Sequence, residues 1–302
     1  MVTFKVGSVI ADRYVVKRAL GKGGMGMVFL VNDQISHRDF ALKTMLPKIL
    51  DHKKAKVRFI REVNLLMQLN HPGIMRVYDA RKWNDILFYV MEYVEGKSLR
   101  QSLQEEGRFP LKTVVRILSL VADALEHAHR VTIHRDLAPE NIMLVPDGSV
   151  RLLDFGLAKL DDKFKDLTGA GTNLGRIEYI APEQQMNASK VDARADIYPL
   201  GIMFFELLVG RRPKFNEKIA DLCPELPYET IEFMRKTTNP DPNKRFHDVS
   251  AFRDELLRVH KIAQGRLPSI SASWKLKTFL RKVFNKINII GYMIKLKSAR
   301  NG

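Results

Sequence analysis

The sequence predicts an α+β protein in which a strand-rich first part is followed by a longer, mainly helical part. Two observations predict this class. Up to about residue 92, short apolar runs alternate with turn residues, whereas later apolar residues recur at helical spacing. Length sets the frame, because 302 residues, 45% hydrophobic and 28% charged, suffice for one or two domain cores.

The first expected elements are strands over 14–20, 27–31 and 38–45. Because alternate side chains of a strand share a face, Ala41 and Lys43 are expected to point to one surface.

A helix is predicted over 53–70, with an apolar stripe of Phe59, Val63 and Leu66. Glu62 lies beside that stripe. A carboxylate at a buried edge needs a partner, and Lys43 is the candidate.

Glycine dominates the turn between the first two strands, at Gly21, Gly23, Gly24 and Gly26. Glycines let backbone N–H groups approach phosphate oxygens. In dinucleotide-binding folds such glycines open a helix, but here 28–31 continues as a strand. The pattern therefore favours a phosphate-covering loop between two strands, and a plain glycine hairpin is the alternative.

The next elements are a strand over 87–92, left through a polar turn at 92–96, and a long amphipathic helix over 111–130. Taken alone, the strand reads as an ordinary core strand and the helix as scaffold. A later helix over 196–209 is apolar on every side and is expected to be buried, with Asp196 capping its start. Glu183 is expected to pair with Arg245.

Between these helices lies the most informative run, His-Arg-Asp-Leu-Ala-Pro-Glu-Asn at 134–141, followed by Asp154-Phe155-Gly156. Two short strands, 142–145 and 150–153, are joined by a Pro-Asp-Gly turn and set Asn141 and Asp154 at adjacent strand ends. With Asp136, they supply a base and two oxygen ligands for Mg²⁺, which phosphoryl transfer from ATP needs.

From about residue 9 to 262 the sequence resembles the bacterial eukaryotic-like (Hanks-type) serine/threonine protein kinases. Besides the two motifs above, the resemblance rests on the Gly-Gly-Met-Gly loop, Asn70-His71-Pro72, Met91-Glu92-Tyr93, Ala181-Pro182-Glu183-Gln184 and Asp196-Ile197-Tyr198. It implies a two-lobed protein kinase fold. A small antiparallel β lobe with one helix spans about 9–92, and a larger, mainly helical lobe spans about 96–262.

The resemblance also implies the roles of individual residues. Asn141 and Asp154 hold Mg²⁺ on the ATP phosphates, and Asp136 accepts or orients the substrate hydroxyl proton. Lys43 steadies the phosphates while paired with Glu62. The implied nucleotide-binding residues are Leu20, Gly21, Gly23, Gly24, Gly26, Val28, Ala41, Lys43, Met91, the backbones of Glu92 and Val94, and Met143.

The stretch 157–180 resembles an activation segment. Arg135, beside the catalytic Asp, suggests control by phosphorylation, because a guanidinium pairs bidentately with a phosphate. Thr168 and Thr172 are the candidate acceptors, and an unmodified loop is the alternative.

Two positions depart from the family pattern. Ala138 stands where serine/threonine kinases usually carry Lys, and Arg176 stands where they usually carry Thr. Losing one charge-stabilising donor costs about 10²–10³ in rate, so we expect a slow enzyme in which Arg176 supplies the missing charge. The alternative from another class is a nucleotide-binding pseudokinase scaffold that signals by conformation.

The net charge is +16, and more than half of it comes from residues 263–302, which hold nine Lys or Arg residues and no acidic residue. We expect a linker over 263–273 and a basic amphipathic helix over 274–300, whose apolar stripe is Leu276, Leu280, Val283, Ile287, Ile290 and Ile294. Such a helix suits an anionic membrane surface. The alternatives are packing on the kinase lobe or binding a partner.

The expected partners are protein substrates and a homodimer for trans-phosphorylation, and no nucleic acid is expected. The lone Cys223 allows no internal disulfide, and residues 1–14 lack the apolar region of a secretory signal. We therefore expect a cytoplasmic protein, peripheral on the inner face of the membrane if the tail binds there.

Overall fold

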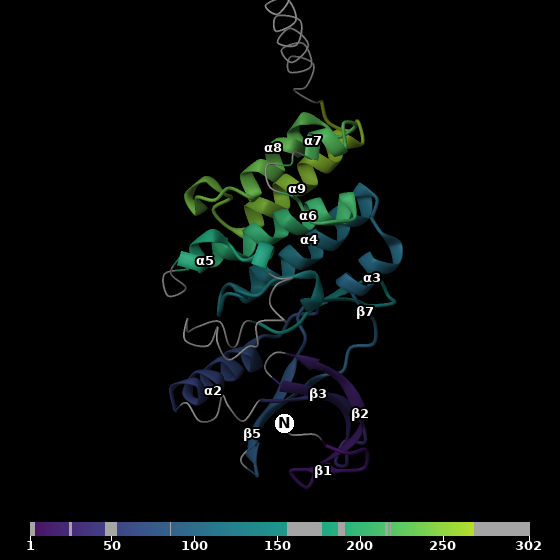
Figure 1. The fold of residues 1–302 in the computed structure, drawn as a ribbon, viewed down its shortest axis with the longest axis vertical. Helices are drawn as coiled ribbons and strands as arrows, with labels where there is room; N and C mark the ends of the chain where they lie inside the picture. Colours follow the sequence, from purple (N-terminus) through teal and green to yellow (C-terminus); the bar gives the residue numbers. More distant parts are fainter. Residues whose placement is uncertain are drawn as a thin grey trace, which may run out of the picture.

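The computed structural model of the protein describes residues 4–23, 26–45, 53–84, 86–155, 177–186, 191–214, 217 and 219–268. At 22–23, 53–56, 58 and 62 it describes the backbone alone. Its chain forms two lobes (Figure 1). The first six strands and helix α2 make one lobe, and the remaining helices make the other, with a small three-stranded sheet where the lobes meet.

The sheet of the first lobe is antiparallel and has the strand order β1-β2-β3-β4-β6-β5. Its strands are β1 Val9–Ile10, β2 Tyr14–Gly23, β3 Gly26–Asp33, β4 Asp39–Thr44, β5 Val77–Trp83 and β6 Ile86–Glu92. The three strands predicted around the glycine loop are confirmed as β2, β3 and β4, and the predicted apolar strand is β6. In the register, Ala41 faces Leu30 on one side and Met91 on the other.

The two faces of this sheet bury different cores, as the alternation predicts. Leu42 belongs to the outer cluster with Phe88, and Ala41 belongs to the large inner cluster that continues into the second lobe. Helix α2, Lys53–Gln68, packs on the inner face with its predicted stripe of Phe59, Val63 and Leu66 buried. The small residue and the cation of β4 therefore lie on the side of the sheet that faces the rest of the molecule.

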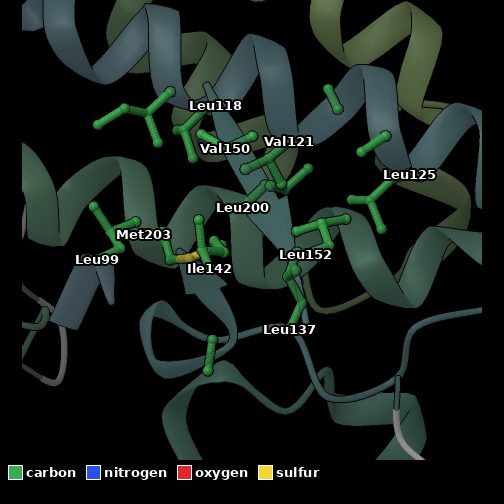
Figure 2. Close-up of a cluster of buried hydrophobic side chains, with 14 of the residues drawn as sticks. Leu99, Leu118, Val121, Leu125, Leu137, Ile142, Val150, Leu152, Leu200 and Met203 are labelled. Carbon is green, nitrogen blue, oxygen red and sulfur yellow. The ribbon is translucent and has the colours of Figure 1, made fainter. Parts of the chain in front are cut away.

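The second lobe is built around two long apolar helices, α4 Leu111–Ala128 and α6 Ile197–Val209. Figure 2 shows Leu118 and Val121 of α4 meeting Leu200 of α6, with Ile142 from the small sheet beside them. The small sheet consists of β7 Lys97–Ser98, β8 Ile142–Leu144 and β9 Val150–Leu152. Burial of apolar area contributes about 25 cal/mol per Å² to stability, so the packing of α4, α6 and the small sheet stabilises this lobe.

The remaining helices complete the second lobe. They are α3 Leu99–Glu106, α5 Pro182–Met186, α7 Ile219–Leu222, α8 Tyr228–Thr237 and α9 Val249–Ala263, with 3₁₀ turns at Pro139–Asn141, Ile177–Tyr179, Ala193–Asp196 and Pro242–Lys244. Helix α3 starts at a capping box, in which Ser98 and Gln101 satisfy each other's backbone N–H groups. It ends at Gly107, whose φ of 76° suits glycine.

Within the ranges given above, no helix has both the length and the apolar character needed to cross a membrane. The predicted tail over 274–300 and the last five residues of its linker, 269–273, lie outside the described residues.

Candidate active site

The loop that carries Asp136 is fastened by one buried carboxylate. Backbone N–H groups of His134 and Arg135 donate to Asp196, each at 2.8 Å, and Nε2 of His129 lies 2.8 Å from the same carboxylate. Asp196 occupies the N-cap position of α6 as predicted, but the expected capping is wrong, since its side chain makes no cap hydrogen bond to α6. The carboxylate serves a loop more than sixty residues earlier in the chain instead.

His134 is fully buried and joins Asp136 to the strand that precedes Asp154. Its Nε2 donates to the carbonyl oxygen of Leu153 at 3.0 Å, and its Nδ1 accepts from the backbone N–H of Asp136 at 3.3 Å. Burial lowers the pKa of His134, so the ring is neutral and can play both roles. The ring also packs against Phe155, with centroids 4.5 Å apart.

Asn141 lies beside Asp136, as the spacing of the motif predicts. Its Nδ2 donates to the carbonyl oxygen of Asp136 at 2.7 Å and to the carboxylate of Asp136 at 3.3 Å. The amide oxygen of Asn141 therefore points away from Asp136. Leu153 donates its N–H to the carbonyl oxygen of Asn141 at 2.9 Å, which brings the next residue, Asp154, to the neighbouring strand end. Amide and carboxylate oxygens are the ligands that Mg²⁺ takes.

Lys43 crosses between the lobes. Its Nζ lies 2.5 Å from Oδ1 of Asp154, and the hydroxyl of Tyr89 donates to the same oxygen at 3.2 Å. Burial, followed by the charge of Asp154, raises the pKa of Tyr89 and keeps its hydroxyl protonated. Tyr89 was missed by sequence reasoning, although it is the cross-strand partner of Lys43. Glu62 lies on α2, but its side chain is outside the described residues, so the pair between Lys43 and Glu62 stays a prediction.

Most of the predicted adenine-binding residues lie on the inner side of the β lobe. Leu20, Val28 and Val94 pack against the same apolar cluster as Ala41 and Met91. Met143 is half-buried on β8, and its side chain alternates away from that of the buried Ile142.

The chain turns tightly where the lobes join and at the glycine loop. After Glu92, a Cβ on Gly96 would lie 2.3 Å from the carbonyl oxygen of Leu144, so only glycine fits there. A Cβ on Gly26 would lie 1.6 Å from the carbonyl oxygen of Thr44. Of the other loop glycines, Gly21 and Gly23 belong to β2, and Gly24 lies outside the described residues.

The surroundings of Arg135 and Ala138 form a small recess beside Asp136, also lined by Tyr179 and Pro199. The Nε of Arg135 is buried and has no hydrogen-bond partner among the described residues. Thr168, Thr172 and Arg176 lie outside them. The predicted ion pair between Glu183 and Arg245 is confirmed, with two contacts of 2.7 Å.

Comparisons with known proteins agree with this geometry. Residues 14–286 match the family model described as a protein kinase domain. The chain is 33% identical over 284 residues to the serine/threonine-protein kinase PknB of Mycolicibacterium smegmatis, covering 86% of this chain and 44% of that protein. It is 32% identical over 257 residues to PrkC of Bacillus subtilis, covering 80% of this chain and 39% of that protein. The chain thus spans less than half the length of these relatives.

Among solved structures, the kinase domain of Mycobacterium tuberculosis PknI superposes with a TM-score of 0.72 at 28% identity, covering 85% of this chain and 100% of that one. The predicted two-lobed kinase fold is confirmed. The chain belongs to the protein kinase family, and specifically to the Hanks-type serine/threonine kinases of bacteria.

Proposed function

We propose that this chain is an ATP-dependent protein kinase that transfers the γ-phosphate to Ser or Thr hydroxyls of proteins. One observation carries the proposal. Lys43 from the β lobe and Asp136, Asn141 and Asp154 from the helical lobe gather at the junction of the lobes, in the arrangement that phosphoryl transfer requires.

Each residue has a role suited to its surroundings. Asp136 accepts the proton of the substrate hydroxyl, and its loop is held in place before substrate arrives. Lys43 steadies the phosphates. Asn141 and Asp154 would hold Mg²⁺, because one presents an amide oxygen and the other a carboxylate. When bound, Mg²⁺ neutralises the charge on the phosphate oxygens.

We expect a slow enzyme, because Ala138 lacks the charge that a lysine would bring to this recess. Arg176 is our candidate for the missing cation. Unchanged phosphotransfer in an Arg176→Ala variant would contradict that role.

Regulation by phosphorylation is supported by Arg135. A buried guanidinium nitrogen without a partner in the described part of the chain is suited to a phosphate on Thr168 or Thr172. Trans-phosphorylation in a homodimer is the route we propose.

The decisive experiment incubates the purified protein with ATP and Mg²⁺ and maps new phosphates by mass spectrometry, beside an Asp154→Asn variant. Phosphate on Thr168 or Thr172 that is absent from the variant supports the proposal. Binding of ATP without any phosphate on the chain or on added protein substrates would contradict it and favour a scaffold.

For the tail, we propose contact with an anionic membrane surface through 274–300. The full chain should bind phosphatidylserine vesicles in a salt-sensitive way, and a chain truncated at residue 264 should not. Equal binding by both forms would exclude this role.

A further inference from the structure

Arg100, the second residue of α3, holds three parts of the helical lobe together. Its Nε donates to Oε1 of Glu140 at 2.7 Å, and its Nη1 donates to Oε1 of Glu206 at 2.7 Å. Its Nη2 donates to the hydroxyl of Tyr179 at 2.7 Å. The same tyrosine hydroxyl donates to Glu206, which closes the group.

The chemistry of this group needs an arginine. The side chain of Glu206 is 3% exposed and that of Arg100 is 20% exposed, so both charges are largely removed from water. Burial opposes the charge of Arg100, but hydrogen bonds to Glu206 and Glu140 outweigh it and raise the pKa of Arg100. A rigid guanidinium fork donates in three directions at once, which an ammonium group cannot reproduce in the same geometry.

Two of the three parts that Arg100 joins, those of Glu140 and Tyr179, reach the proposed active site. Glu140 directly precedes Asn141 in one 3₁₀ turn, and Asn141 donates to Asp136. Tyr179 ends the turn Ile177–Tyr179, which leads out of the expected activation segment. The Oε2 of Glu140 is buried without a partner in the described part of the chain, so Arg100 is what fixes this carboxylate.

We infer that Arg100, acting through Glu140, is a positioning residue that sets Asn141 for metal binding and links it to the end of the activation segment at Tyr179. This inference rests on the proposed kinase function. It assigns Arg100 no contact with substrate or nucleotide. Glu140 is the chain neighbour of Asn141 and not its hydrogen-bond partner. Because partners of metal ligands change metal affinity about 10–100-fold, we expect an effect at the lower end of that range, and it should appear first in the dependence on Mg²⁺.

The chain offers a closely matched control. Arg253 also holds two carboxylates, Asp123 at 2.9 Å and Glu126 at 2.8 Å, between α4 and α9. The side chain of Glu126 is 35% exposed and that of Glu140 is 37% exposed. Glu140→Ala and Glu126→Ala thus remove equivalent ion pairs, one beside Asn141 and one away from it.

The experiment measures ATP binding by the full chain with and without Mg²⁺, using calorimetry, together with urea unfolding. Glu140→Ala should raise the Mg²⁺ concentration for half-maximal enhancement of ATP binding about tenfold. Metal-free ATP affinity should change little, because most of the predicted adenine contacts lie on β2, β3, β4 and β6, in the other lobe from Glu140. Arg100→Lys should shift the Mg²⁺ requirement in the same direction, and Glu126→Ala should not shift it.

Equal Mg²⁺ requirements in the two alanine variants would overturn the inference, as would loss of cooperative folding in Glu140→Ala. The proposed function fails separately. A wild-type chain that binds ATP with Mg²⁺ but transfers no phosphate contradicts the kinase activity, while the shift in Glu140→Ala still decides the role of Arg100.

Discussion

The two acidic residues at the centre of the site are held in opposite ways. Asp136 lies in a loop fastened within one lobe by Asp196, whose side chain is 1% exposed. Asp154 has a side chain that is 37% exposed, and Lys43 reaches it from the other lobe. The proton-accepting residue is therefore fixed within one lobe, whereas the position of the Asp154 side chain depends on how the lobes meet.

The largest effect on stability should come from removing Asp196, which holds the loop that carries Asp136. Asp196→Ala leaves two backbone N–H groups and His129 without their acceptor, so we expect a loss of about 3–5 kcal/mol in unfolding free energy. Urea unfolding measures it. Asp248→Ala, which removes the half-exposed cap of α9 and a surface contact with His247, should cost about 1 kcal/mol. Equal losses would show that the contacts of Asp196 to the loop contribute no more to stability than an ordinary helix cap.

Substitution of Asp154, which Lys43 contacts from the other lobe, should lower activity more than stability. Asp154→Asn removes a proposed metal ligand from a partly exposed position, so phosphotransfer should fall at least about 10²-fold while unfolding free energy changes by less than about 1 kcal/mol. Phosphate incorporation and urea unfolding report the two quantities. A strongly destabilised Asp154→Asn variant would contradict the difference drawn here between Asp136 and Asp154.

A smaller effect should follow from adding a cation to the recess beside Asp136. Ala138→Lys restores the residue type that the family usually carries, and we expect a gain of about 10-fold or more in phosphotransfer rate. Ala138→Met controls for side-chain length without charge. If both variants gave the same rate as the wild type, another residue would already supply the charge.

The smallest effect concerns pH. Burial lowers the pKa of His134 below its usual 6.5, so the unfolded chain binds more protons as pH falls below that value. Unfolding free energy should decline below about pH 6.5, with His134 contributing at most about 1.4 kcal/mol per pH unit. His134→Gln should flatten the decline measured by urea unfolding from pH 7.5 to 5 relative to the wild type. Parallel curves would contradict a buried neutral ring.

Local patterns in the sequence predicted much of this molecule. Alternation along β4 assigned Ala41 and Leu42 to opposite faces, and the hairpin turn correctly placed Asn141 next to Asp154. These features depend on residues close together in the chain, so period and turn chemistry suffice to find them.

Contacts between distant segments were not predictable in the same way. From the local sequence, Asp196 looked like a helix cap. Its actual hydrogen-bond donors, the N–H groups of His134 and Arg135, lie more than sixty positions earlier, so the local pattern could not reveal them. The group around Arg100 joins segments up to 106 positions apart. No local pattern encodes such pairings, although the Ser98 capping box could have located the start of α3.

The backbone of Asp154 has a practical consequence for anyone who wants an inactive form of the chain. Its φ of 47° lies in the left-handed region, which asparagine and aspartate tolerate better than other side chains. Alanine there would add backbone strain to the loss of the carboxylate, so a silent Asp154→Ala protein would mix two causes. Asparagine keeps the conformation and removes only the charge, which makes it the cleaner inactive reference.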